Sequence, residues 1–469
     1  MQSKAQKTDN SRVTRKRILI EASKLADVKM DGIKRYVVEL LCAFSRLNLE
    51  DDIHLDVLIF DNVYPLAGLP TEYLALEQPA PEQDARHRWL GRLGRLVPPI
   101  LVRPAKYLIP AWASRRFIGK EKQHIRVPAV KLTVRNLPLL VLPPAIMTLL
   151  QKMTPVRLEQ YLRARGILEP TPVAVDKPHY DVIHLTLPNV YQHIRNMSTP
   201  LLVTVHDLCH IACPEHQTRS NSITLKTGLD LAVSRDANFL AVSMATQEQL
   251  IEEYSLDPGR IRKVHNGCSA EHFHPVRDPA MRKQTCQKYG IPNSPFLLAL
   301  STIEPRKNLA FTIEAFNLLV QDLAGLDINL IIAGARGWKD HGIIQAAEKS
   351  ERIHLTGYIA DEDLAYIYSS ARGFVYASHY EGFGFPLIEA MSCGLPVIYG
   401  NNSSMPEIVG NAGLPVNAHD IHDITRQMHR LVCDDELAGS LSRRSLERAR
   451  EFSWEKTAAQ TLTAYREFS

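Results

Sequence analysis

The sequence predicts an α/β protein with two doubly wound domains, each a parallel sheet covered by helices on both faces. Two series of short, almost continuous apolar segments alternate with helical patterns, which is typical of strands buried on both faces. The length of 469 residues allows two or three domains at about 150 residues each. Hydrophobic residues make up 45% and charged residues 23%, which excludes disordered, collagen-like and disulfide-scaffold proteins.

The first series predicts a domain over residues 17–290. Residues 1–16 are polar and basic, and we expect a disordered tail there. A helix is expected after Gly32, because Val37, Leu40, Leu41 and Phe44 fall on one face at helical spacing. The strands are expected at 17–22, 54–60, 180–185, 200–208, 238–243 and 262–267.

Prolines interrupt the pattern between about residues 80 and 178, and we interpret this stretch as an insertion in the first domain. Its part 86–165 contains 17 Lys and Arg against two acids, a charge of +15, and the remainder of the chain carries −11. Cations mixed with aromatic side chains suit an anionic membrane surface. A helical hairpin on the first domain and a subunit contact are alternatives. No nucleic-acid-binding motif is present, and nucleic acid is not an expected partner.

Neither a secretory signal nor a membrane-spanning helix is predicted. The first 17 residues contain no apolar core of a signal peptide. The longest apolar run, 137–150, has 14 residues and three prolines, whereas a spanning helix needs about 20 residues. Seven scattered cysteines are interpreted as thiols of a cytosolic protein.

The second series predicts a domain over residues 291–452, after a boundary near 290–295. The strands are expected at 296–301, 328–334, 353–358, 373–378 and 396–400. The helices are expected at 308–325, 340–350, 361–371 and 385–393. In such sheets, ligands bind beyond the carboxyl ends of the strands, where helix N-termini offer free N–H groups. We therefore expect the site in a cleft between the two domains.

Adjacent cations follow the first strand of the second domain. Arg306 and Lys307 lie just before a predicted helix, where one side chain can bind two phosphate oxygens and the other supplies a point charge. This position suits a diphosphate. An exposed charged loop is the alternative interpretation.

A glycine-rich helix start with two carboxylates follows the strand 373–378. Gly382 and Gly384 would let the backbone approach a ligand closely, and Pro386 and Gly394 are expected at the two ends of the helix. Glu389 is expected in its first turn, facing the same cleft as Glu381. Two carboxylates there can accept hydrogen bonds from sugar hydroxyls. Acids that complement the helix dipole are the alternative, which explains the glycines poorly.

Other candidates are weaker when taken singly. Gly32 could bring backbone N–H groups to a phosphate or could simply serve a turn. His206 ends a strand and could exchange a proton or play a structural role. One short segment contains His206, Cys209, His210, Cys213 and His216, and their interleaved spacing leaves little room for a tetrahedral zinc site. Residues 361–363, Asp-Glu-Asp, are better interpreted as a helix start than as a metal–diphosphate ligand.

Several motifs together resemble those of family-4 glycosyltransferases with the two-domain GT-B fold. In the second half they are STIEPRKN (301–308), HLTGYIADEDLAYIY (354–368), the Glu-x7-Glu spacing from Glu381 to Glu389, and GLPVIYGNNSSMPEIVG (394–410). In the first half they are DGIKRYVVELL (31–41), VTVHDL (203–208), AVSMATQEQL (241–250) and VHNG (264–267). Residues 452–458 resemble the start of a C-terminal helix, 453–469, that returns to the first domain.

The resemblance implies a retaining transfer of a sugar from a nucleotide diphosphate sugar, with no metal or other cofactor. It implies that Arg306 and Lys307 bind the donor diphosphate, Glu389 the ribose and Glu381 the hexose hydroxyls. Phe383 and Gly384 would add backbone donors, and Tyr358 and Ile359 would border the base. Gly32 would approach a phosphate or the acceptor, and His206 would contact the transferred sugar.

The subgroup it resembles also implies the biological context. Mannosyl- and rhamnosyltransferases of bacterial surface polysaccharides share these motifs, which favours GDP-mannose and a lipid-linked glycan acceptor at the cytoplasmic face of the membrane. A UDP- or dTDP-sugar donor, a nucleotide-sugar epimerase and a phosphorylase of the same fold are alternatives. Two positions depart from the pattern: Lys34, which could be a phosphate cation, and Ser301 replace glycines.

Overall fold

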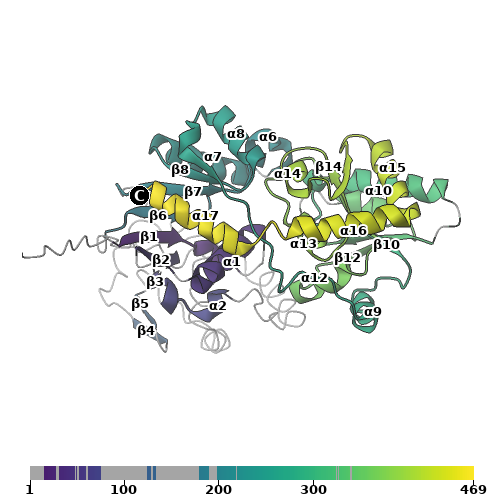
Figure 1. Ribbon diagram of the computed structural model, residues 1–469, viewed down its shortest axis with the longest axis horizontal. Helices are drawn as coiled ribbons and strands as arrows, with labels where there is room; N and C mark the ends of the chain where they lie inside the picture. Colours follow the sequence, from purple (N-terminus) through teal and green to yellow (C-terminus); the bar gives the residue numbers. More distant parts are fainter. Residues whose placement is uncertain are drawn as a thin grey trace, which may run out of the picture. The chain divides into compact units, whose positions relative to one another are not determined.

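The computed structural model describes two large, mainly parallel sheets with helices packed against them (Figure 1). The described residues are 15–27, 31–47, 49, 52–59, 62–74, 124–127, 130–133, 179–189, 198–217, 219–323, 325, 327–337 and 341–469.

The first sheet has seven strands in the order β3-β2-β1-β6-β7-β8-β9. All neighbours are parallel except β2 and β3, which form an antiparallel pair. The strand β1 has neighbours on both sides, which agrees with the full burial of Ile18, Leu19 and Ile20. The strands are β1 (Lys16–Glu21), β2 (Ile53–Ile59), β3 (Asn62–Pro65), β6 (Val182–Leu185), β7 (Leu201–Val205), β8 (Asn238–Ala241) and β9 (Ile261–Lys263).

Helix α1 (Gly32–Arg46) begins where the sequence predicts it. Asp31 is its N-cap, and the Asp31 side chain accepts a hydrogen bond from the backbone N–H of Lys34. The predicted apolar face is buried at Val37, Leu40, Leu41 and Phe44. The other helices beside this sheet are α2 (Thr71–Leu74), α6 (Cys209–Ala212), α7 (Arg219–Ser234) and α8 (Met244–Tyr254). We call these elements, with the first sheet, the first lobe.

The second sheet has six parallel strands in the order β12-β11-β10-β13-β14-β15. They are β10 (Phe296–Leu300), β11 (Asn329–Ala333), β12 (Ile353–Gly357), β13 (Gly373–Tyr376), β14 (Val397–Gly400) and β15 (Gly413–Val416). Its helices are α9 (Pro279–Lys288), α10 (Leu309–Asp322), α11 (His341–Ala347), α12 (Asp361–Tyr368), α13 (Phe385–Ser392), α14 (Met405–Val409), α15 (Ile421–Cys433) and α16 (Asp435–Ala449). These elements form the second lobe.

Two of the four edge strands of these sheets, β3 and β15, are absent from the sequence prediction. Both are short, and β15 contains Pro415, which normally argues against a strand. An edge position tolerates proline, because one side of the strand needs no ladder hydrogen bonds. Each strand that the sequence predicts overlaps an observed strand.

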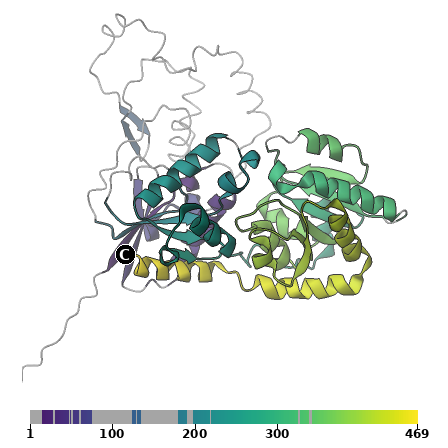
Figure 2. The ribbon, with the colours of Figure 1, turned by 90° about the horizontal axis from the view of Figure 1, so that it is seen from above.

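The C-terminal helix α17 (Trp454–Glu467) packs against α1 of the first lobe, whereas α16 packs against α13 of the second (Figures 1 and 2). Near the end of α17, the Arg466 side chain lies 2.9 Å from the carboxylate of Asp52. The chain therefore returns to the first lobe at its end, at the position that the sequence predicts for such a helix.

Two predictions about the N-terminal half need comment. The predicted disordered tail 1–16 is too long: Lys16 belongs to β1, and Arg15 Nε donates to the carbonyl of Ile53 at 3.3 Å. Residues 1–14 lie outside the described part of the chain. Within the predicted insertion 80–178, only the antiparallel strands β4 (His124–Val127) and β5 (Val130–Thr133) are described. The basic segment 86–165 otherwise lies outside the described residues.

The described part of the chain also bears on membrane crossing. None of the helices in it combines the length and the apolar character that a membrane-spanning helix requires.

Candidate active site

A cleft of about 490 Å³ lies between the carboxyl ends of the two sheets. It is lined from the first lobe by the start of α1 and the loops after β7 and β9, and from the second by the loops after β10, β11, β12 and β13. All ten residues predicted for the site line it: Gly32, His206, Arg306, Lys307, Tyr358, Ile359, Glu381, Phe383, Gly384 and Glu389. The structure therefore brings the predicted set together, while the role of each residue stays a prediction.

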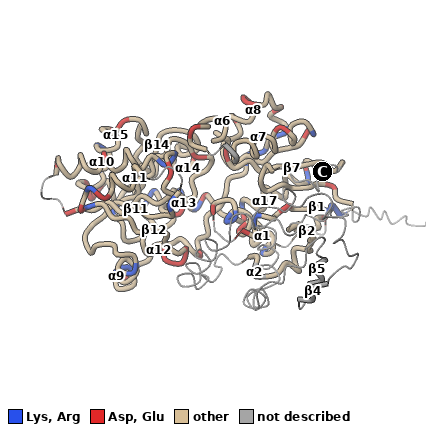
Figure 3. Tube along the Cα trace, turned by 180° about the vertical axis from the view of Figure 1, so that it is seen from behind, with Lys and Arg blue, Asp and Glu red and all other residues tan. Residues whose placement is uncertain are grey.

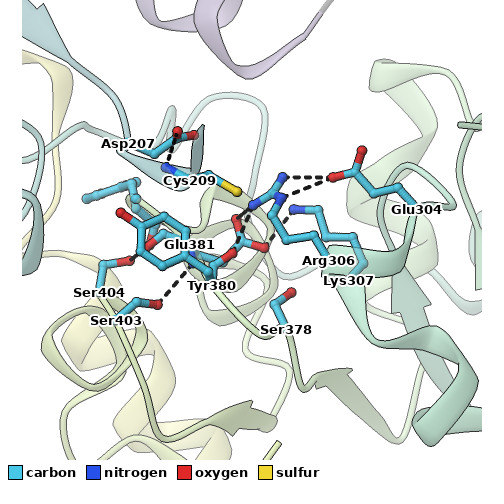
Figure 4. A network of polar contacts seen from close by, with 12 residues as sticks. Asp207, Cys209, Glu304, Arg306, Lys307, Ser378, Tyr380, Glu381, Ser403 and Ser404 are labelled. Carbon is cyan, nitrogen blue, oxygen red and sulfur yellow. Dashed lines mark hydrogen bonds and ion pairs between the residues drawn. The ribbon is translucent and has the colours of Figure 1, made fainter. Parts of the chain in front are cut away.

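Three of these residues form an ion cluster (Figure 4). Arg306 Nη1 lies 2.9 Å from Glu381 Oε2, and Lys307 Nζ lies 2.7 Å from Glu381 Oε1. Arg306 also binds the carboxylate of Glu304 at 3.0 Å and donates to the carbonyl of Tyr380 at 2.9 Å. Lys307 donates to the hydroxyl of Tyr376 at 2.8 Å. The cations predicted to bind a diphosphate are thus held by carboxylates, so a phosphate must share or displace these contacts.

Burial and charge oppose each other at this cluster. Burial raises the pKa of Glu381, but Arg306 and Lys307 outweigh it and lower the pKa to about 2. Burial and the neighbouring Arg306 lower the pKa of Lys307, although Glu381 opposes this effect. Glu381 is therefore ionised at neutral pH, and the ion cluster places fixed charge in a buried setting.

Backbone contacts fix the two loops that carry the cluster. Arg306 and Lys307 lie in a single 3-10 turn, η7 (Pro305–Lys307), which ends at Asn308 with φ of 55°. The Asn308 amide donates to the carbonyls of Ala377 and Ala418 at 3.0 and 2.7 Å. The N–H of His379 donates to the carbonyl of Arg306 at 2.9 Å. The η7 turn is thereby joined to the loop that carries Glu381.

The glycines of this loop serve different purposes. Gly384, with φ of 96°, is the N-cap of α13, Pro386 lies in the first turn, and Gly394 with φ of 75° ends the helix as predicted. Gly382 lines the cleft, and its close approach to a ligand stays a prediction. A Cβ on Gly382 would lie 1.8 Å from the carbonyl oxygen of His206, so in this structure Gly382 allows close approach to the first lobe.

Glu389 is in the second turn of α13 and not, as predicted, in the first, because the helix starts at Phe385. Its carboxylate pairs with Arg35 of α1 and accepts a hydrogen bond from the Tyr368 hydroxyl at 3.0 Å. Burial raises the pKa of Glu389, and Arg35 opposes that effect. The helix dipole is therefore a poor explanation for this acid, since its partner is a cation of the other lobe.

His206 faces the cleft from the end of β7. Its Nε2 lies 2.9 Å from the carbonyl oxygen of Thr186, so Nε2 carries the proton in the neutral ring and Nδ1 is left as an acceptor. The ring of Tyr36 meets it edge-on, with centroids 4.8 Å apart. Burial lowers the pKa of His206, which favours the neutral ring.

The remaining predicted residues lie at the start of α1 and just after the end of β12. Tyr358 is 60% exposed and Ile359 is buried, just after β12. Gly32 is the first residue of α1. The suggestion that Lys34 is a phosphate cation is not supported, because Lys34 is 2% exposed and is not among the residues lining the cleft.

The sequence patterns considered for metal binding take other positions. Asp361 starts α12, as the helix-start interpretation predicts. Within the described residues, no three or more His, Cys, Asp or Glu side chains are grouped in a way that could hold a metal ion. This includes the Cys and His residues of the segment 206–216.

The cleft lining also contains residues that sequence reasoning missed, among them Arg35 and Asn266. Arg35 lies in the quoted stretch DGIKRYVVELL, and its charge on a largely buried helix was the available signal. Asn266, in VHNG, is 1% exposed, and its Oδ1 has no hydrogen-bond partner within the described residues. A buried polar atom of this kind at a cleft is available to a ligand.

Family models match both halves of the chain. The model described as "Glycosyl transferases group 1" matches residues 281–448, and that described as "Glycosyltransferase Family 4" matches residues 124–272. The second match begins inside the stretch that the sequence suggests as an insertion.

Similar proteins and structures agree with these matches. The O-antigen chain mannosyltransferase B of Escherichia coli is 35% identical over 268 residues, which cover 56% of this chain and 70% of that protein. The serotype-specific mannosyltransferase WbdA of Escherichia coli is 32% identical over 49% of this chain, but only 28% of that protein is covered. HepE of Anabaena, solved in complex with UDP and glucose, superposes with a TM-score of 0.58 at 15% identity, covering 96% of this chain and 99% of that one. The chain belongs to glycosyltransferase family 4 and is a glycosyltransferase with the GT-B arrangement of two Rossmann-like domains.

Proposed function

We propose that this enzyme is a retaining, metal-independent hexosyltransferase that moves mannose from GDP-mannose to a hydroxyl of a lipid-linked glycan in bacterial surface polysaccharide synthesis. The observation that carries the proposal is the convergence of Arg306, Lys307, Glu381 and Glu389 with His206 in one cleft. The mannose assignment follows the relatives, which are named O-antigen and serotype-specific mannosyltransferases.

The donor would lie along the second lobe. Glu389 would accept hydrogen bonds from the ribose hydroxyls, with the base between Tyr358 and Ile359. The diphosphate would lie at Arg306 and Lys307, and the hexose would be held by Glu381 and the backbone at Phe383 and Gly384. His206 would accept a hydrogen bond from the sugar through Nδ1, since its Nε2 is already used by Thr186.

In the chemical step, the bond between the anomeric carbon and the phosphate oxygen breaks while the acceptor oxygen bonds to the same carbon on the same face. The acceptor proton passes to the leaving phosphate oxygen, and a nucleoside diphosphate departs. Negative charge grows on the diphosphate in this step. The fixed cations Arg306 and Lys307 supply electrostatic stabilisation, and removing one such group typically costs about 3 kcal/mol.

A covalent sugar–enzyme intermediate is not part of the proposal. Both oxygens of Glu381 are held by cations, at 2.9 and 2.7 Å, which makes this carboxylate a poor nucleophile. This geometry supports direct front-side attack by the acceptor.

The proposed acceptor and location rest on the basic segment. The segment 86–165, with its charge of +15, supports contact with an anionic membrane at the cytoplasmic face, where a lipid-linked glycan would be presented. Binding to vesicles with and without anionic lipid, compared between the full chain and a variant with six of these cations neutralised, tests this part.

The central test is a transfer assay with GDP-mannose and a panel of UDP- and dTDP-sugars, with EDTA present, and product analysis by NMR. We expect an α-mannoside with retained configuration, and a loss of about 100-fold in rate for Arg306→Ala and Glu381→Ala. Near wild-type transfer by either variant would refute the site. An epimerised sugar nucleotide or phosphorolysis would instead favour an epimerase or a phosphorylase, and a requirement for metal would contradict the mechanism.

A further inference from the structure

Arg35 is a first-lobe side chain that reaches into the second lobe. Its guanidinium pairs with Glu389 of α13 through Nη1 and with Asp361 of α12 through Nη2 at 2.8 Å. It also lies over the ring of Phe273, 5.5 Å from the centroid. The Arg35 side chain is 14% exposed and that of Glu389 is 5% exposed. One planar group thus binds two acids on two helices of the opposite lobe.

The groups of the second lobe around Glu389 do not favour its ionised form. On the second lobe it faces the hydroxyl of Tyr368, the acid Asp361 and the neighbouring thiol of Cys393, and the thiol of Cys268 lies near it as well. Within the described residues, Arg35 is the one cation that pairs with it. A buried carboxylate without a cation tends to take up a proton.

The Asp361 contact strengthens the need for Arg35. Three acids lie in the first turn of α12, which Figure 3 shows in red. Asp361 raises the pKa of Glu389 by repulsion, so two carboxylates share a single guanidinium. Without that guanidinium, the repulsion between them would remain.

We propose that Arg35 is a positioning residue for the donor: from the first lobe it holds Glu389 of the second lobe ionised and oriented to accept hydrogen bonds from the ribose. The inference rests on the proposed function, in which Glu389 binds the ribose. Its consequence is that the nucleotide site is complete only when α1 lies against α13, so donor binding and the approach of the two lobes are coupled.

The test is calorimetric binding of GDP, with UDP and dTDP measured in parallel, at about pH 6.5 and about pH 8.5. For Arg35→Gln we expect at least about tenfold weaker binding at the lower pH and substantial recovery at the higher pH, because Glu389 regains its charge. Arg35→Lys, which keeps the charge, should lie between this variant and the wild type. The wild type should change little between the two pH values.

Arg46→Gln is the matched control. Arg46 lies on the same helix, is 56% exposed and, within the described part of the chain, makes only 3.7 Å pairs with Glu271 and Glu455, so its loss should leave binding at both pH values unchanged. Glu389→Gln should bind weakly at both pH values, because a neutral amide has no charge to regain.

The outcomes separate the two proposals. If Arg35→Gln binds like the wild type, or equally poorly at both pH values while Arg35→Lys gives no recovery, the positioning role of Arg35 is wrong. If Glu389→Gln binds like the wild type, or the wild-type protein binds none of the three nucleotides, the proposed function itself fails.

Discussion

Gly382 lies so close to His206 that a single added methyl group would not fit: a Cβ on Gly382 would be 1.8 Å from the carbonyl oxygen of His206 and 2.7 Å from Cβ of Asp207. The two residues belong to different lobes. Beside them, the hydroxyl of Tyr380 accepts a hydrogen bond from the backbone of Leu208 at 3.1 Å and donates to Gln249 at 2.7 Å. The loop that carries Glu381 is therefore seated directly on the strand end that carries His206.

Gly382→Ala should separate these two parts of the site. Because the obstructing atom is a backbone oxygen, either loop must move, and a displacement of about 1 Å in a catalytic site can cost about 100-fold in rate. We expect such a loss in the transfer assay, with a moderate fall in Tm.

Gly342→Ala is the control for this substitution. Gly342 lies in α11, has an ordinary helical backbone, and a Cβ there meets nothing within 4 Å. The alanine should leave the rate unchanged and stabilise the protein by about 0.4–1 kcal/mol. An unaltered rate for Gly382→Ala would show that the close approach has no bearing on the site.

The alternation of apolar strands and helices was sufficient to predict the order of elements, because strands buried on both faces leave a strong pattern. It was insufficient at the edges of the sheets, where β3 and β15 are short. In β15, Pro415 also interrupts the strand pattern. Ten of the cleft residues could be predicted as well, since the carboxyl ends of parallel strands meet at one edge.

What the sequence could not show is which side chains bind one another. Nothing in the spacing of Arg35 and Glu389 indicates an ion pair 354 residues apart, and the partner of Gly382 is likewise a residue of the other lobe. Such contacts depend on how two lobes meet, and local periodicity contains no information about that.

Lys307→Arg should change the alkaline side of the activity profile. Burial and Arg306 lower the pKa of Lys307. As pH rises, the wild-type enzyme should therefore lose this cation, and with it kcat/KM, at a pH below the ordinary pKa of lysine. Arginine stays protonated, so the variant should be slower at neutral pH but show no alkaline fall up to about pH 10. The measurement is kcat/KM from about pH 7 to about pH 10 for both proteins. The same alkaline fall in both would assign it to another group.

His184→Gln should reduce the sensitivity of the fold to acid. His184 is fully buried, with Nδ1 at 2.7 Å from the Tyr465 hydroxyl and Nε2 at 2.8 Å from Oγ1 of Thr204. Burial and the nearby His206 lower its pKa to about 3. The unfolded chain therefore takes up this proton below about pH 6.5 and the folded protein does not, so stability falls as pH drops through that window.

Urea unfolding measures how the free energy of unfolding depends on pH in the two proteins. Between about pH 7.5 and about pH 5, His184 should account for a loss of about 2 kcal/mol in the free energy of unfolding. The glutamine variant should be less stable at neutral pH but lack this part of the acid dependence. If the free energy of unfolding fell equally steeply with pH in both proteins, His184 would have the same pKa in the folded and unfolded states.

Glu407→Gln should weaken the contact between the lobes away from the cleft. Glu407 of α14 accepts a hydrogen bond from the N–H of Met244, at the start of α8, at 2.7 Å, and binds Lys263 at 3.0 Å and His265 at 2.6 Å. Burial raises its pKa, but these three donors outweigh burial and lower it to about 2. An amide would offer an N–H where Lys263 and His265 now meet a carboxylate oxygen.

Hydrogen bonds to a charged group contribute about 1.5–3 kcal/mol, so a fall of about 2 kcal/mol in the free energy of unfolding is expected at neutral pH. Glu348→Gln, an exposed acid of the second lobe, should change stability by less than about 0.5 kcal/mol. Since the lowered pKa of Glu407 stabilises the fold only while the carboxylate is ionised, the difference between wild type and Glu407→Gln should shrink as pH falls from about 4.5 to about 2. A difference that stays constant over this range would trace the loss to packing, because a protonated carboxyl and an amide hold the same three donors equally poorly.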